Sequence, residues 1–370
     1  MRTGKEFGAH QFHILSFLVG LLVAILLVYC SDNNDDDSTN DDHADDDTVD
    51  DDTIDDDTAD DDGPTFDLYA VTTTACSDYY PYYCWDIYRC KAKRCMVMES
   101  QNDQIGLAAA IWVSENSEIF LVGDDGLIWE FDGVSWQEHV DITDAFLADV
   151  WGTNANDVFA VGSLRGYDPP VDHPGHIIMH FDGDYWMEMK RGQDKKLSAV
   201  WGTSHDSVYA VGAGLILHYD GTSWQRMEVD ENWTLYTVWG TSDQDVFAGG
   251  SDQNGKAIII HFDGQAWTNM ATFFSDDTEA VRDFWGLAPS NVYGVANISD
   301  RGGLIVRFDG HEWSEFMRLD GSSLNEIWGV TDTNIFVAGL DSIHHFDGQE
   351  WSLVRGLQWP YVYDLAGVVH

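Results

Sequence analysis

Short hydrophobic segments, separated by polar residues and glycine, cover most of the chain, and one pattern recurs six times between Ile111 and Trp351. Each copy holds four segments rich in β-branched and aromatic residues, separated by Gly, Asp, Asn and Ser. In one copy these segments are residues 197–201, 207–211, 215–219 and 223–227. Such segments, bounded by turn residues, predict short strands. Asp-Gly between the third and fourth segments predicts a hairpin with a two-residue turn, in which both positions have positive φ.

Three anchors align the six copies. Each copy opens on a tryptophan that glycine usually follows, and six residues later it has a polar, an aliphatic and an aromatic residue. It closes with an aromatic residue, Asp, Gly, two variable positions and a second tryptophan. Four strands in a repeat of about forty residues are typical of a β-propeller blade, and we expect the repeated tryptophans to pack between blades. The opening tryptophans are Trp112, Trp151, Trp201, Trp239, Trp285 and Trp328, and the closing ones are Trp136, Trp186, Trp224, Trp267, Trp313 and Trp351.

The spacing of the copies predicts a seventh blade built from both ends of the chain. In four of the five junctions, 15 residues separate a closing tryptophan from the next opening one. The same count from Trp351 reaches Ala366, in a segment that resembles a first strand, and residues 67–71, 82–90 and 95–100 supply three further strands. Such a closure pairs the edges that an open array would expose. We expect an all-β, seven-bladed propeller; six blades with an N-terminal cap is the alternative.

The N-terminus predicts export and a membrane attachment. Arg2 and Lys5 precede an apolar run, residues 14–29, which is long enough for a secretory signal and short for a membrane span. The run ends in "LVYC", which resembles the lipobox of bacterial lipoproteins, in which the cysteine, here Cys30, is lipidated and begins the mature chain. Tyr29 replaces the small residue of that pattern, and an uncleaved signal anchor is the alternative. Both interpretations place the rest of the chain outside the cytoplasm, on a bacterial membrane or cell surface.

Charge separates a tether from the folded part and excludes one class of partner. The chain carries a formal charge of −47, and residues 31–62 hold 18 aspartates without Lys or Arg. Such a segment repels itself and lacks apolar residues to bury, which predicts a disordered linker. We therefore divide the chain into a leader (1–29), an acidic linker (30–64) and a propeller (65–370). Nucleic acid is excluded as a partner because its phosphates require a basic surface.

Four cysteines lie in the predicted composite blade. An even number of cysteines in an exported domain favours disulfides. Three pairings are open, and hairpin geometry favours Cys76 with Cys84 and Cys90 with Cys95, the latter across the turn where other copies have Asp-Gly. The spacings do not fit a zinc site.

The loop lengths predict which face of the propeller binds. Links from first to second strand and the Asp-Gly turns are constant, whereas links from second to third strand vary. Variable loops on a rigid scaffold are the usual place for binding residues. The variable segments are residues 163–176, 251–256, 273–279 and 298–303, and tolerated insertions without a ligand are the alternative. The candidate binding residues are Arg165, Tyr167, His173, His176, Asp276 and Arg301.

Carboxylates two positions before the opening tryptophans form a second candidate site. On innermost strands they would surround an axial channel and attract a cation such as Ca²⁺. Hydrogen bonds to neighbouring backbone or to Arg282 are the alternative, and no motif for any other cofactor is present. The carboxylates are Asp149, Asp283, Glu326 and Asp364. A further set of repeated residues predicts a cross-strand structural role: His180, His218, His261 and His345.

The pattern WGT, DVFAVG, HFDG and W, from Ile111 to Trp351, resembles secreted bacterial β-propeller repeat proteins, and more distantly tectonin, Kelch and Asp-box repeats. These families imply ligand or protein binding, and the sialidase branch implies glycoside hydrolysis. The serine-containing Asp-box pattern and the "FRIP" motif of that branch are not found in this sequence.

We therefore expect a membrane-tethered, extracytoplasmic propeller that is not an enzyme and binds a glycan or an envelope protein. One rival is a glycoside hydrolase or lyase that uses an acid pair at the channel mouth. The other rival is a purely structural component of the cell surface.

Overall fold

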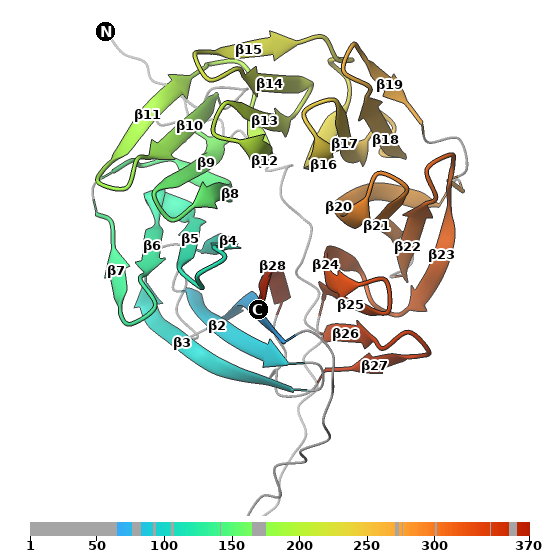
Figure 1. Cartoon of the computed structure of the whole chain (residues 1–370), viewed down its shortest axis with the longest axis horizontal. Coiled ribbons are helices and arrows are strands. Elements are labelled where there is room, and N and C mark those ends of the chain that lie inside the picture. The colour runs from blue at the N-terminus through green and yellow to red at the C-terminus, as the bar shows by residue number, and fades with distance from the viewer. Residues whose placement is uncertain are drawn as a thin grey trace, which may run out of the picture. The chain divides into compact units, whose positions relative to one another are not determined.

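The computed structural model describes residues 65–75, 83–91, 94–104, 107–140, 142–164, 175–270, 274–275, 277–299, 302–340, 342–354 and 361–370. The leader, the acidic linker, Cys30 and Cys76 lie outside these residues, so their predictions stay predictions. Within the described part, 28 strands form seven antiparallel sheets of four strands each. The sheets stand around a central axis as propeller blades (Figure 1). The prediction of an all-β, seven-bladed propeller is confirmed, and the six-bladed alternative is wrong.

The strands of the first three blades, each written from the axis outward, are as follows. Blade 1 is β28 (Tyr361–Val369), β1 (Phe66–Ala75), β2 (Tyr83–Lys91) and β3 (Arg94–Gln104). Blade 2 is β4 (Ala108–Val113), β5 (Ile119–Gly123), β6 (Ile128–Phe131) and β7 (Trp136–Glu138), with one 3-10 turn, η1 (Asp124–Gly126). Blade 3 is β8 (Phe146–Asn154), β9 (Asp157–Ser163), β10 (His176–Phe181) and β11 (Trp186–Arg191).

The remaining four blades repeat this order. Blade 4 is β12 (Leu197–Ser204), β13 (Ser207–Gly212), β14 (Leu215–Tyr219) and β15 (Trp224–Met227). Blade 5 is β16 (Thr234–Ser242), β17 (Asp245–Ser251), β18 (Ala257–Phe262) and β19 (Trp267–Asn269). Blade 6 is β20 (Thr278–Ala288), β21 (Asn291–Ile298), β22 (Gly302–Phe308) and β23 (Trp313–Asp320). Blade 7 is β24 (Leu324–Thr331), β25 (Asn334–Gly339), β26 (Ser342–Phe346) and β27 (Trp351–Leu353).

Blade 1 closes the ring with strands from both ends of the chain. Its innermost strand, β28, pairs antiparallel with β1, and Phe66 lies opposite Val369 in the register. The His370 N–H donates to the Thr65 carbonyl at 2.8 Å, and Arg89 Nε donates to the Asp67 carboxylate at 2.8 Å. The predicted closure by a C-terminal strand is therefore confirmed. So is the Cys90–Cys95 disulfide across the β2–β3 hairpin, whereas the side chain of Cys84 lies outside the described residues.

The Asp-Gly hairpins differ from the predicted two-residue turn. In blade 4 the last ladder pair is Tyr219 with Trp224, so the loop has four residues, and Gly221 takes a positive φ of 82° while Asp220 does not. The Asp220 carboxylate instead accepts the N–H groups of Thr222 and Ser223, both at 2.9 Å. An aspartate side chain that bonds the backbone two residues on closes a turn without a second residue at positive φ. The two-residue prediction is therefore wrong.

The hydrophobic core is divided among the interfaces between neighbouring blades. One cluster, for example, joins residues of β5 with residues of β8, β9 and β10. Opening tryptophans pack across these interfaces against the glycine of the next blade: a Cβ added at Gly202 would lie 2.8 Å from Trp151 Cη2. Blade 1 has Ala366 where the others have tryptophan, and blade 2 has Val113 where the others have glycine. Ala366 of blade 1 is smaller than tryptophan and leaves room for Val113 of blade 2, which is larger than glycine. Packing at this one interface therefore explains both exceptions.

This packing predicts a double-mutant result. Gly240→Ala places a methyl group 2.8 Å from Trp201 Cη2 and 2.6 Å from the Asp245 carbonyl oxygen. Overpacking of this kind costs about 1–3 kcal/mol of unfolding free energy. We expect the cost of Gly240→Ala to fall in a Trp201→Ala background, as the natural Val113 and Ala366 pair implies. Urea unfolding of the four chains of the cycle measures the coupling, and equal costs in both backgrounds would contradict it.

No helix in the part of the chain that the structure describes is both long and apolar enough to cross a membrane.

Candidate functional site

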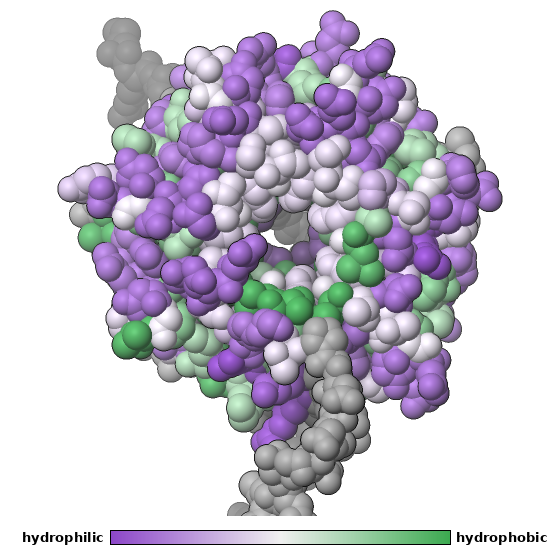
Figure 2. Space-filling model, viewed as in Figure 1, coloured by the Kyte–Doolittle hydropathy of each residue, from purple (hydrophilic) through white to green (hydrophobic). Residues whose placement is uncertain are grey.

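An axial channel runs between the innermost strands, and its mouth is visible at the centre of the ring (Figure 2). The cavity measures about 360 Å³ and contains all four predicted carboxylates. Each carboxylate comes from the innermost strand of a different blade: Asp149 from β8, Asp283 from β20, Glu326 from β24 and Asp364 from β28. The sequence therefore placed these residues correctly around one axis.

The three aspartates join neighbouring blades through the backbone. Asp149 accepts the N–H of Val150 at 2.8 Å and the N–H of Val200, in blade 4, at 2.7 Å. A β-bulge between residues 147 and 149 interrupts the ladder beside it, and a bulge leaves backbone groups unpaired. Asp364 accepts Leu365 and Ile111 in the same manner, at 2.7 Å each. The carboxylates thus satisfy amides that face the channel, which is the backbone alternative considered for these residues.

Asp283 completes this pattern between blades 6 and 7, because it accepts the N–H of Ile327 at 3.0 Å. It also accepts the hydroxyl of Thr237, in blade 5, at 3.1 Å. These bonds occupy both oxygens of each aspartate, which leaves less of the carboxylate for a cation. A Ca²⁺ site at Asp149, Asp283, Glu326 and Asp364 stays a prediction.

Burial and mutual repulsion shift the carboxylates toward their neutral forms. Burial raises the pKa of Asp149 to about 7 and that of Asp283 to about 6, although their backbone hydrogen bonds oppose the shift. The pKa of Glu326 is raised well above its ordinary value by burial and by the charges of Asp283, Asp364 and Asp149. The pKa of Asp364 is raised for the same reasons, burial and the charge of Asp149. The channel therefore takes up protons near neutral pH.

The raised values predict how stability depends on pH. A group whose pKa is higher in the folded chain than its ordinary 3.8 stabilises the fold fully at low pH, and the contribution is lost as the pH rises through the folded value. We expect the free energy of unfolding to fall between about pH 4 and pH 7, by a few kcal/mol in order of magnitude. Blades 2 and 4 have alanine at the position of Asp149. Asp149→Ala should therefore make the fall of the unfolding free energy with pH less steep. Urea unfolding at several pH values tests both, and an unchanged slope would contradict the assignment.

A second cavity lies where three of the predicted variable segments meet. It measures about 420 Å³ and is bordered by residues of segments 251–256, 273–279 and 298–303, together with side chains of β16 and β20. We call it the variable-loop pocket and define it by Tyr236, Ser251, Asn254, Lys256, Glu279 and Arg282. Two of the 18 basic residues of this acidic chain thus line one pocket.

Arg282 is the side chain in this pocket that lacks a partner for one of its donors. Its guanidinium carbon lies 4.7 Å from the centre of the Tyr236 ring, within range of a cation–π contact. Its Nε is buried and has no hydrogen-bond partner. Buried donors are normally satisfied by protein groups or by ordered water. Arg282 and Tyr236 border the axial channel as well, so the pocket lies next to the channel mouth.

The structure describes only one of the six candidate binding residues. Arg165, Tyr167, His173, Asp276 and Arg301 lie outside the described residues, so their roles stay predictions. His176 is buried with only 4% of its surface exposed, and its Nδ1 lies 3.0 Å from the Lys195 carbonyl oxygen. Burial lowers its pKa. His176 therefore supports the base of its loop and does not present its ring to a partner.

The repeated histidines have the predicted cross-strand role. His180 Nε2 lies 2.7 Å from Asp157 Oδ1, and His261 Nε2 lies 2.6 Å from Asp245 Oδ1. The rings also lie on the aromatic residue of the opposite strand, as His180 does on Phe159 with 4.5 Å between centroids. His218 bonds Ser207 and His345 bonds Asn334 in the same position. The sequence reasoning passed over His205, which joins the first of these pairs from the neighbouring blade.

Comparisons with known proteins agree with this architecture. No protein-family model matches the chain, and no curated protein sequence matches it. The WD40 β-propeller domain of Doa1 has a TM-score of 0.54 at 13% identity, and the match covers 70% of this chain and 84% of that one. A chain of the mitotic checkpoint complex has a TM-score of 0.54 at 11% identity, covering 79% and 88%. A structure of YCF48 bound to a D1 peptide has a TM-score of 0.49 at 15% identity, covering 75% and 87%.

At identities this low, the two matches with a TM-score of 0.54 show a shared fold. The chain is a β-propeller repeat protein.

Proposed function

We propose that the protein is an extracytoplasmic binding propeller, tied to a bacterial membrane through lipidated Cys30 or an uncleaved signal anchor. Its variable-loop face recognises a glycan or an envelope protein, and the variable-loop pocket takes a polar or acidic group of that ligand. The propeller is a scaffold in this proposal and carries out no reaction of its own.

The convergence of three variable segments on one pocket that is lined by Lys256 and Arg282, two cations of a strongly acidic chain, carries this proposal. The pocket offers the hydroxyl of Ser251, the amide of Asn254 and the charge of Lys256 beside Arg282. Its volume of about 420 Å³ lies within the range of small-ligand sites. A carboxylate of the ligand would pair with the guanidinium group of Arg282, because guanidinium groups suit carboxylates in particular.

A binding screen against glycans and envelope proteins tests the proposal. We expect Arg282→Gln to weaken binding of the recovered ligand by about 10-fold or more, since a hydrogen bond to a charged group contributes about 1.5–3 kcal/mol. Arg191→Gln is the matched control, because it removes the same charge from an exposed side chain of β11 that pairs with Glu188. A ligand that binds both variants equally well would place recognition elsewhere.

One observation favours a second candidate function, a glycan-acting enzyme. The raised pKa of Glu326, beside Asp283 and Asp364, is the property that a general acid needs. The rival predicts that a bound glycan is cleaved and that Glu326→Gln abolishes cleavage without abolishing binding. Binding without any release of new sugar ends would leave the scaffold proposal as the better one.

A further inference from the structure

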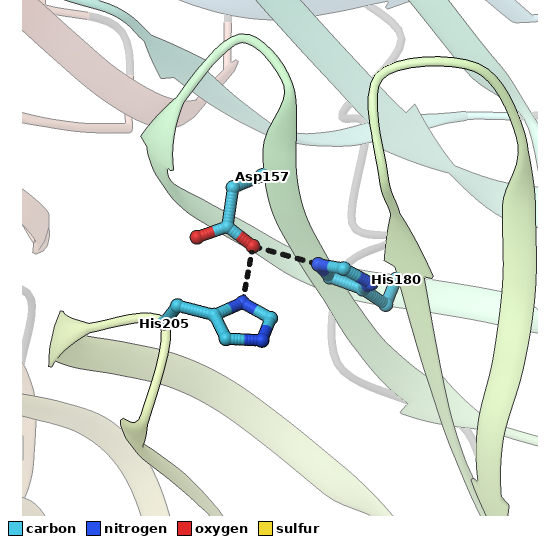
Figure 3. Close-up of side chains that lie close together, drawn as sticks. All are labelled: Asp157, His180 and His205. Carbon is cyan, nitrogen blue, oxygen red and sulfur yellow. Dashed lines mark hydrogen bonds and ion pairs between the residues drawn. The ribbon is translucent and has the colours of Figure 1, made fainter. Parts of the chain in front are cut away.

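A cluster of two imidazoles and one carboxylate lies at the interface of blades 3 and 4, away from the variable-loop pocket. Asp157 begins β9, His180 belongs to β10 of the same blade, and His205 lies in the turn between β12 and β13. Figure 3 shows both rings directed at the same carboxylate oxygen. That oxygen, Asp157 Oδ1, lies 2.7 Å from His180 Nε2 and 2.8 Å from His205 Nδ1.

The three donor atoms all lie within 4.8 Å of one another. Bonds of about 2.0–2.2 Å from zinc to nitrogen and oxygen place two ligands of one ion roughly 3–3.5 Å apart. Small side-chain rotations would therefore bring all three atoms into a common coordination sphere. Among the described residues, no other group of His, Cys, Asp and Glu meets this distance condition.

The surroundings hold the three ligands in place. Thr153 Oγ1 donates to the second oxygen of Asp157 at 2.5 Å, which orients the carboxylate as an outer-sphere partner does in known metal sites. Phe159 packs against both imidazoles, with centroid distances of 4.5 Å to His180 and 5.9 Å to His205. The carboxylate of Asp157 is therefore already held toward both rings.

One side of the cluster is open. The side chains of His180 and Asp157 are 9% and 13% exposed, whereas that of His205 is 47% exposed. An ion can therefore enter from the side of His205, and a water molecule or a ligand can complete its coordination. Three protein ligands with one open position are typical of zinc sites that act on or hold a further group.

The other blades show that the third ligand is not part of the repeat. Blade 5 has the same pair, with His261 Nε2 at 2.6 Å from Asp245 Oδ1. The residue of blade 6 that matches His205, four positions after the opening tryptophan, is Pro289. The structural role of the pair is thus fulfilled without a third ligand. Only His205 distinguishes the interface of blades 3 and 4 from that of blades 5 and 6 in this respect.

We propose that Asp157, His180 and His205 form a binding site for a divalent transition-metal ion of the Zn²⁺ class. Imidazole and carboxylate together are ligands that Zn²⁺ and its first-row neighbours accept. The ion would link blade 3 to blade 4 on the face of the ring that carries the short, constant turns.

Titration of the full chain with Zn²⁺ and with Co²⁺ tests the site. We expect one tight site in the wild type, with the visible absorption of Co²⁺ in a nitrogen and oxygen environment. His205→Ala should lose that absorption and weaken Zn²⁺ binding by more than the roughly 10–100-fold that loss of an outer-sphere partner costs. Because His205 is half exposed, this substitution leaves the fold intact, which the melting temperature without metal verifies.

His261→Ala is the control, since it removes the blade 5 histidine that corresponds to His180 and should leave the Co²⁺ spectrum and the tight Zn²⁺ site unchanged. The control also accounts for weak binding by the acidic linker and the remaining histidines, which all variants share. Equal affinity and equal spectra in wild type and His205→Ala would overturn the proposal, and so would an equal loss in His261→Ala.

Discussion

Removal of the last strand, residues 361–370, is expected to abolish the cooperative unfolding transition of the propeller. Strand β28 buries Val362, Leu365 and Val368 with exposures of 0%, 8% and 7%, and burial of three such side chains contributes roughly 5–9 kcal/mol. That contribution is comparable to the whole stability of a typical protein. Deletion also removes Asp364, whose carboxylate bonds Ile111 of blade 2, and leaves the edge of β1 unpaired. An unpaired edge promotes aggregation.

Circular dichroism and urea unfolding of the truncated chain measure this effect. Removal of residues 369–370 alone is the control, because Val369 is 48% exposed and most of the β1–β28 ladder is retained. A synthetic peptide of residues 361–370 should restore part of the transition when added to the truncated chain. A truncated chain that unfolds at the wild-type urea concentration would show that the ring does not depend on β28.

Phe247→Ala is expected to lower the free energy of unfolding by about 3–5 kcal/mol. Phe247 is fully buried and lies between blades 5 and 6, with its ring centroid 5.3 Å from that of Phe308 and 5.6 Å from that of Trp313. Its removal leaves a cavity at an interface where both walls are strands of rigid sheets, so little collapse can occur.

Equilibrium urea unfolding, followed by tryptophan fluorescence, gives the value. Tyr185→Ala is the control, because Tyr185 is 74% exposed and should change the stability by less than about 0.5 kcal/mol. Phe247→Leu should fall between the two. A loss below about 1 kcal/mol in Phe247→Ala would mean that the repeated aromatic position is not a main source of stability.

Much of the fold follows from local patterns. Runs of β-branched and aromatic residues and the tryptophan anchors determined the strands, because the anchors recur at the same positions in every repeat. The constant 15-residue junction located Ala366, and so the strand that closes the ring. Counting was sufficient there, since blades of equal size require connections of equal length. The Cys90–Cys95 pair followed equally from its hairpin, in which the two cysteines lie opposite each other.

The sequence patterns did not predict how the turns close or which groups form hydrogen bonds between blades. The Asp220 side chain closes its own turn, which the dipeptide Asp-Gly alone did not indicate. Sequence placed Asp149 at the axis but did not indicate that its carboxylate would bond Val200, 51 residues further on. Such a bond depends on the bulge in one blade and on the register of the next.

The sequence by itself thus determined the blades, their number, the closing strand and the face that carries variable loops. The tertiary structure alone decided which side chains meet between blades: Arg282 over Tyr236, and His205 beside Asp157, 48 residues apart. The physical reason is that a repeat encodes the strands within one sheet, where pairing is local and periodic. The rotation of one sheet against the next is set by packing around the whole ring, and it brings together residues that no single repeat contains.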